Sequence, residues 1–390
     1  MLHFNNMHPR ITLSVGNFFF AISSTLTAYI LFPYLDTFMS AQYAGLVISG
    51  GAVIALILFV FIPHAIKKYG AQTLAVFLGI GQMITLFALS ARPNAIGAVI
   101  FAAILIIFGP LLTYTLDILL EATVAKEGVT GRVRTLFLTA YNVAMIGTPL
   151  LMGSLLNTTN AYSRIFIASA AAITPFIILF AVHKIPSGKT PKIMRLPEAL
   201  SVLQHDRNLS AVTIAHFLLY LFYAWAPLYV PVYLHTTLHI PWSQLGWMFS
   251  IMLIPFVLIE YPAGIIADRI LGDKELMVLG FIIMGSAFAA FSFITKSSSI
   301  FFIVTLLVAS RIGAALVESM TEAHFFRAVS EADTEMIALY RMAWPFADIV
   351  APLIGSALLF TGGFSWFFIV TGGLLIFIGM GSAVAIRDFQ

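Results

Sequence analysis

Long apolar stretches alternate along the chain with short joints that carry charged residues, glycine or proline. A helix that crosses a hydrocarbon core of about 30 Å needs roughly 20 apolar residues. Twelve stretches reach that length, and the pattern predicts helices near 11–35, 42–65, 73–91, 96–124, 133–157, 162–183, 209–234, 242–266, 276–295, 299–325, 334–360 and 364–386. We therefore expect an all-α membrane protein with twelve transmembrane helices.

The composition agrees with a membrane setting, because 60% of the residues are hydrophobic and only 9% are charged. Cysteine is absent, so no disulfide, Cys-ligated metal or thiol chemistry is expected. The sequence contains no P-loop, no Gly-x-Ser-x-Gly elbow and no metal-spaced His/Cys cluster. We expect no metal and no cofactor, and these absences disfavour an enzyme or an ATP-driven pump. The first apolar run is too long for a signal peptide and is expected to stay as the first helix.

The basic residues indicate topology. The net charge of +3 is spread over the joints, so no nucleic-acid partner is expected. If the first helix leaves the cytoplasm, nearly all the Lys and Arg residues of the joints fall on the cytoplasmic side, and only Arg92, Arg164 and Lys296 fall on the other. This bias predicts cytoplasmic termini and a multi-pass protein of the cytoplasmic (inner) membrane, embedded in the lipid bilayer.

A pair of carboxylates one helical turn apart is repeated in the two halves of the chain. Asp117 and Glu121 recur 201 residues later as Glu318 and Glu322. The longest joint, basic and rich in proline, lies between the halves. We therefore expect an N-terminal six-helix bundle over residues 1–183, a cytoplasmic linker over 184–208 and a C-terminal six-helix bundle over 209–390. Parallel repeats of this kind are typical of transporters that bind their substrate between two bundles.

The joint between the eighth and ninth predicted helices reads GIIADRILGDK at residues 264–274. It resembles the G-x-x-x-D-R-x-G-R-K loop signature of the major facilitator superfamily, with one residue inserted before the second glycine. The corresponding joint of the first half, residues 63–70, has Lys67 where the family has aspartate. With twelve spans and a central basic loop, the resemblance covers the whole chain. It implies two pseudo-symmetric bundles around a central cavity and transport by alternating access. We expect the protein to work as a monomer.

Residues of this joint are candidates for a cytoplasmic gate. Gly264 is expected to permit a tight exit from its helix, Asp268 to cap or pair with a helix of the other bundle, and Arg269 to hold acids of its own bundle. The other expected members are Glu121, Glu322, Arg132 and Arg134. Such a cluster would stabilise the state that is closed on the cytoplasmic side, and a static salt-bridge cluster without gating is the alternative.

Charged residues deep in a predicted span carry more information, because a charge at the bilayer centre costs at least about 2.5–3.5 kcal/mol on insertion scales. Arg311, Arg341 and Asp348 qualify, and the last two share a helical face. We favour Asp348 as the protonatable residue or substrate counter-ion, with Arg311 or Arg341 as its partner. A static buried ion pair is the alternative. Further proton-coupling candidates, each of which could instead only pair with a nearby basic residue, are Glu318, Asp117 and Glu260.

Candidates for substrate contact follow from the helices that line the cavity in the family that the chain resembles. They are polar and aromatic, and packing or membrane-interface roles are the alternatives. The set comprises Asn17, Tyr29, Asp36, Tyr114, Tyr141, Asn142, His216, Tyr220, Tyr223, Trp225 and Trp344.

The fifth predicted helix carries GTPLLMG at residues 147–153. This run is similar to a degraded form of the glycine and proline signature of proton-driven exporters of the superfamily, and a general packing kink is the alternative. Because the cavity candidates are largely aromatic, we favour a secondary active transporter that exports an amphipathic or drug-like compound against protons. Proton-coupled uptake of a sugar or other metabolite is the alternative, and a membrane receptor or scaffold is a third class.

Overall fold

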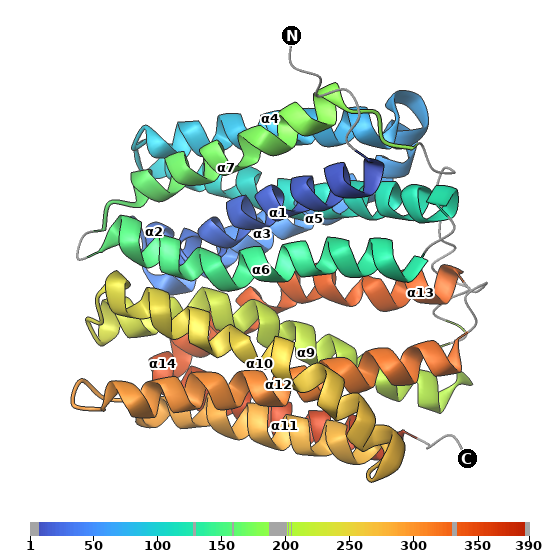
Figure 1. Ribbon diagram of the computed structural model, residues 1–390. Coiled ribbons are helices and arrows are strands. Elements are labelled where there is room, and N and C mark those ends of the chain that lie inside the picture. The colour runs from blue at the N-terminus through green and yellow to red at the C-terminus, as the bar shows by residue number, and fades with distance from the viewer. Residues whose placement is uncertain are drawn as a thin grey trace. The chain divides into compact units, whose positions relative to one another are not determined.

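A computed structural model of the protein describes residues 8–127, 130–157, 160–186, 201, 203, 205–329 and 334–386. Within these ranges the chain is almost entirely helical and forms no β-strand. Contacts divide it into two compact units, each built from helices that lie side by side (Figure 1). Unit 1 is Met1–Ile193 with Ile240–Trp247, and unit 2 is Met194–His239 with Met248–Gln390.

The described helices of unit 1 follow one another with short joints. They are α1 (Pro9–Ala28), α2 (Leu31–Asp36), α3 (Ala41–Tyr69), α4 (Ala71–Ser90), α5 (Ala95–Glu127), α6 (Thr130–Leu156) and α7 (Tyr162–Val182). The helices of unit 2 are α9 (Arg207–Val232), which continues as a π-helical turn (Tyr233–Thr237), α10 (Trp242–Arg269), α11 (Asp273–Ala290), α12 (Ile300–Ala328), α13 (Thr334–Arg341) and α14 (Ala343–Ala385). The first turns of α10 belong to unit 1.

Eleven of the described segments are long and apolar enough to cross a membrane. The longest, Leu339–Ala385, contains Gly363 with φ 69° and ψ −164°, which divides α14 into two helices. Only glycine adopts that backbone conformation readily. With α14 counted as two, the described helices supply twelve crossings, and the predicted all-α twelve-helix fold is confirmed.

Large apolar side chains on these helices point outward. Phe77 is 63% exposed, Phe301 82% and Phe377 79%. Side chains of this kind on helices of this length match a bilayer rather than water. The exposed apolar surface therefore supports the membrane setting that the composition predicts.

Two predicted spans are broken in the structure. The first span is α1 followed by α2, because the helical hydrogen bonding is interrupted at Tyr29 and Ile30. The eleventh is α13 followed by α14, with Met342 between them. Pro33 and Pro345 lie four residues after Tyr29 and Arg341, and a proline cannot donate to the carbonyl oxygen four residues earlier, so the local sequence carries a signal for both breaks.

Close approach of backbones fixes the packing of α11 against α12 in unit 2. A Cβ atom added at Gly280 would lie 2.8 Å from the carbonyl oxygen of Gly313. The core beside this contact is aromatic, and Trp225 is fully buried with its indole N–H donating to the carbonyl oxygen of Ala351 at 2.8 Å. These contacts hold α9, α11, α12 and α14 as one body on which the site described next is built.

Candidate functional site

A hydrogen-bonded tyrosine and glutamate form the centre of the site in unit 2. The Tyr223 hydroxyl on α9 donates to the Glu318 carboxylate on α12 at 2.5 Å, and both side chains are half-buried. A hydrogen bond to a carboxylate that short is a strong, charge-assisted contact. The structure therefore brings together two residues that the sequence placed in different lists, one as a cavity residue and one as a proton-coupling candidate.

Arg311 lies two helical turns before Glu318 on the same face of α12. Its side chain is only 5% exposed, and its guanidinium carbon lies 4.9 Å from the centroid of the Phe222 ring. A guanidinium over an aromatic face gains a cation–π interaction. Its charge also acts on the Tyr223 hydroxyl. Arg311 thus places a buried positive charge beside the Tyr223–Glu318 pair.

Aromatic rings extend from this pair toward α14. The rings of Tyr223 and Tyr220 lie edge to face with centroids 5.8 Å apart, and Tyr220 and Trp344 are nearly parallel at 6.4 Å. Trp344 lies one helical turn before Asp348 on the same face of α14. Asp348 is half-buried. The rings therefore form a continuous row between the carboxylates of Glu318 and Asp348.

His216 and Trp225 are buried inside unit 2. His216 is 1% exposed and stacks on the Tyr340 ring with centroids 3.7 Å apart, and Tyr340 stacks on Phe325 at 3.8 Å. Among the described residues neither ring nitrogen of His216 has a hydrogen-bond partner. Both side chains pack in the interior, in line with the packing alternative for such residues.

Helical spacing predicts that Arg341 and Asp348 share a face, but the described part of the chain has no ion pair between them. The Arg341 guanidinium donates two hydrogen bonds to the Glu322 carboxylate, at 2.7 and 3.0 Å, and its side chain is 50% exposed. Arg341 is the last residue of α13, and Glu322 lies on α12. The structure thus pairs Arg341 with a residue that was expected in the gate.

The gate candidates are only partly described. Gly264 lies inside α10, which continues to Arg269, so it does not provide the tight helix exit that we expected. Arg269 and Glu121 are exposed. The side chains of Asp268, Arg132 and Arg134, and that of Glu260 among the proton-coupling candidates, fall outside the described residues, as does most of the predicted linker 184–208.

The candidates of unit 1 do not form one cluster. The side-chain amide of Asn17 is buried and donates to the carbonyl oxygen of Phe137 at 3.0 Å, which ties α1 to α6. Tyr114 packs on Phe59 with centroids 4.6 Å apart, and Asp117 is exposed. Tyr29 is buried just after the end of α1, and the remaining candidates are half-buried on α2 and α6, namely Asp36, Tyr141 and Asn142.

Gly153, the last residue of the GTPLLMG run, makes the close backbone contact that the small residues of this run predict. A Cβ atom added at Gly153 of α6 would lie 2.9 Å from the Cα atom of Gly246, in the first turns of α10. Both residues belong to unit 1. The contact explains the need for a small residue at this position by packing alone.

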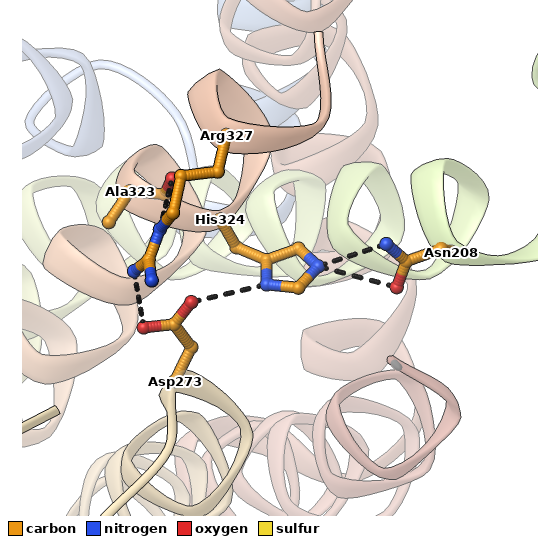
Figure 2. A network of polar contacts seen from close by, with 5 residues as sticks. All are labelled: Asn208, Asp273, Ala323, His324 and Arg327. Atoms are coloured by element: carbon orange, nitrogen blue, oxygen red, sulfur yellow. Dashed lines mark hydrogen bonds and ion pairs between the residues drawn. The ribbon is translucent and has the colours of Figure 1, made fainter. Parts of the chain in front are cut away.

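A polar network that the sequence did not single out lies where the starts of α9 and α11 meet the end of α12 (Figure 2). The buried Asp273 carboxylate accepts a hydrogen bond from Arg327 at 2.7 Å and contacts Nδ1 of His324 at 3.2 Å. The other ring nitrogen of His324 lies 3.1 Å from the amide nitrogen of Asn208. A histidine and an arginine three residues apart in the last turns of a helix are the sequence signal that could have indicated it.

In the described part of the chain, no group of three or more His, Cys, Asp or Glu residues could hold a metal ion. The arrangement in unit 2 suits a different chemistry. It offers two carboxylates that can take up a proton or a positive charge, a buried arginine and a row of aromatic faces.

Residues 212–388 match the model of the Major Facilitator Superfamily. The chain is similar to the crystal structure of the nucleoside transporter NupG, with a TM-score of 0.77 and 14% identity over 97% of this chain and 99% of that one. It is also similar to a bacterial homolog of the human lysosomal transporter Spinster in an inward-facing and occupied conformation, with a TM-score of 0.79 and 12% identity over 97% of this chain and 96% of that one. No curated protein matches the chain.

Identities this low show a shared fold and nothing of substrate or direction. The family match covers the helices that carry Tyr220, Tyr223, Arg311, Glu318 and Asp348. The C-terminal part of the chain thus matches the family model of the major facilitator superfamily, and the fold that the chain shares with two membrane transporters extends over nearly its whole length.

Proposed function

We propose that the protein is a secondary active transporter that moves a small amphipathic organic solute by alternating access and couples this movement to protons. The observation that carries the proposal is the 2.5 Å hydrogen bond between Tyr223 and Glu318, beside the buried charge of Arg311. A carboxylate in this position can bind and release a proton within a membrane-spanning helix.

Protonation of Glu318 changes the contacts around it. The ionised carboxylate accepts a charge-assisted hydrogen bond from Tyr223, and the positive charge of Arg311 favours that state. A proton on the carboxylate removes its charge and weakens both interactions. The two protonation states therefore differ in the contacts that link α9 to α12, and a coupling ion acts by such a difference between states.

The other proton-coupling candidates have different roles in the proposed mechanism. Asp348 is the second carboxylate of the site. Arg341 is held by Glu322, and Asp117 is exposed on unit 1, so we give both a smaller role. Glu260 stays a sequence-based prediction.

The transport cycle follows from the sequence-based predictions. In the proposal, residues 1–183 and 209–390 act as two bundles that rock within the cytoplasmic membrane, and the protein works as a monomer. The joint at Asp268 and Arg269 closes the cytoplasmic side, together with Glu121, Arg132 and Arg134. Export is favoured because the residues around Glu318 are largely aromatic. Uptake of a sugar or other metabolite is the alternative.

The test uses the purified full chain in sealed proteoliposomes with an imposed pH gradient. Fluxes of a fluorescent amphipathic dye and of protons are recorded for the wild-type protein, for Glu318→Gln and for the control Glu275→Gln, an exposed acid in the first turn of α11. We expect Glu318→Gln to lose gradient-driven dye accumulation and the accompanying proton flux, while dye exchange without a gradient persists. The control should behave as wild type.

Full gradient-driven transport by Glu318→Gln would refute the coupling role of this carboxylate. The direction of the gradient that drives accumulation separates export from uptake. Proton-coupled accumulation of a sugar or metabolite, in the absence of dye transport, would favour the alternative function.

A further inference from the structure

The row of rings in unit 2 ends at a carboxylate that has no ionic partner in the described part of the chain. No basic side chain forms an ion pair with Asp348 there, and no neighbouring charge acts on it. The side chain one helical turn earlier on the same face of α14 is the neutral indole of Trp344. A half-buried carboxylate that lacks a positive partner is costly in a membrane-spanning helix, and a positively charged ligand would offset that cost.

The two arginines near the site contact other residues. Arg341 gives both of its terminal nitrogens to Glu322 at 2.7 and 3.0 Å. Arg311 packs on Phe222 and acts on Tyr223, at the opposite end of the row. Asp348 is therefore the carboxyl group at the α14 end of the row, and the described arginines form no ion pair with it.

The rings next to Asp348 have accessible surface. Trp344 is 37% exposed, and Tyr220 and Tyr223 are half-buried. Tyr223 also lies edge to face with Phe256 of α10, with centroids 5.9 Å apart. Aromatic faces attract an organic cation through their quadrupole, and tryptophan does so most strongly. Several rings beside one carboxylate provide apolar contact and charge compensation for the same ligand.

We propose that Asp348, Trp344 and Tyr220 form a subsite that binds the positively charged group of an amphipathic organic monocation. The inference rests on the proposed function and specifies the substrate class of that site. Glu318 remains the proton-binding carboxylate, so proton and substrate charge occupy different residues. A neutral solute of the same size would gain the apolar contact with the rings and lose the attraction to Asp348.

Equilibrium binding in detergent tests the subsite without transport. The probe is radiolabelled tetraphenylphosphonium, and the neutral comparison is triphenylphosphine oxide. We expect the wild-type protein to bind the cation more tightly than the neutral compound. Asp348→Asn should weaken cation binding by roughly tenfold or more and leave neutral binding unchanged, whereas Trp344→Leu should weaken cation binding by about 2- to 30-fold.

Two variants control for charge and folding. Asp348→Glu keeps the charge and should retain most of the cation affinity, and Glu275→Gln removes an exposed acid of unit 2 and should bind as wild type. Each variant is compared after its thermal unfolding transition shows that it is folded. Equal binding of the cation and the neutral compound, or unchanged cation affinity in folded Asp348→Asn, would overturn the subsite.

These outcomes are separable from those of the transport test. Cation binding that depends on Asp348, together with an absence of any gradient-driven flux, would refute the proposed transport function and leave the subsite standing. Proton-coupled flux of a neutral solute without cation binding would refute the subsite and leave the transport function standing.

Discussion

Replacing Asp273 by alanine should destabilise unit 2, because this carboxylate joins three helices (Figure 2). Asp273 opens α11, and its side chain is 6% exposed. It contacts His324 and Arg327 near the end of α12, and His324 in turn contacts Asn208 at the start of α9. Since a carboxylate only accepts hydrogen bonds, Nδ1 of His324 carries the proton, and in the neutral ring Nε2 accepts from the Asn208 amide.

The magnitude follows from the two contacts that are lost. His324 is 1% exposed, so its Nδ1–H would remain buried without an acceptor, at a cost of about 1–3 kcal/mol. The Arg327 side chain is 44% exposed and can be solvated, so that ion pair contributes about 0–1 kcal/mol. The sum is about 2 kcal/mol, which corresponds to a decrease in Tm of about 4–8 °C for a bundle of this size.

The assay is thermal unfolding of the purified full chain in detergent, followed by circular dichroism. The matched control is Glu275→Ala, because Glu275 lies in the same first turn of α11 and is exposed. Arg327→Ala should lower Tm by less than half as much as Asp273→Ala. Equal Tm values for Asp273→Ala and Glu275→Ala would refute the reasoning, since they would mean that the buried His324 keeps its stability without the carboxylate.

Three further predictions concern single residues. Tyr223→Phe removes the hydrogen bond to Glu318 and should alter the pH dependence of transport in proteoliposomes while preserving binding of the solute; an unchanged pH profile would contradict the proposed coupling. Gly363→Ala should lower Tm, because alanine at φ 69° and ψ −164° costs about 1–3 kcal/mol. The control Gly373→Ala should leave Tm unchanged, because no atom lies within 4 Å of the added Cβ. Gly280→Ala should cost about 1–3 kcal/mol in the same unfolding assay, because its Cβ would meet the facing backbone of α12, and an unchanged Tm would show that α11 and α12 can separate freely.

The hydrophobic pattern was sufficient for the number and order of the helices. Every predicted span corresponds to a described helix or to part of one, because in lipid each spanning segment must satisfy its backbone hydrogen bonds internally. The pattern did not reveal the interruptions at Tyr29 and Met342. Both breaks are followed by a proline, Pro33 or Pro345, which removes a helical hydrogen bond, but a count of apolar residues alone does not register that effect.

The candidate site also combines residues that the sequence predicts with contacts that only the tertiary structure shows. Sequence reasoning selected Glu318, Tyr223, Tyr220, Trp344 and Asp348 as separate polar or aromatic residues in apolar helices. It did not join Tyr223 to Glu318 or Arg341 to Glu322. Helical spacing predicts which residues share a face of one helix, but contacts between α9, α12 and α14 depend on how those helices are rotated against one another.

The sequence by itself determined the membrane setting, the all-helical class and the residue types available for chemistry, because these follow from composition and from a periodicity that each segment carries alone. Only the tertiary structure decided which charges are paired. It pairs Arg341 with Glu322, brings Asp273 to His324 and leaves Asp348 beside aromatic rings. A charge buried in a low dielectric depends on the groups within a few ångströms of it, and those groups come from helices that are distant in the chain.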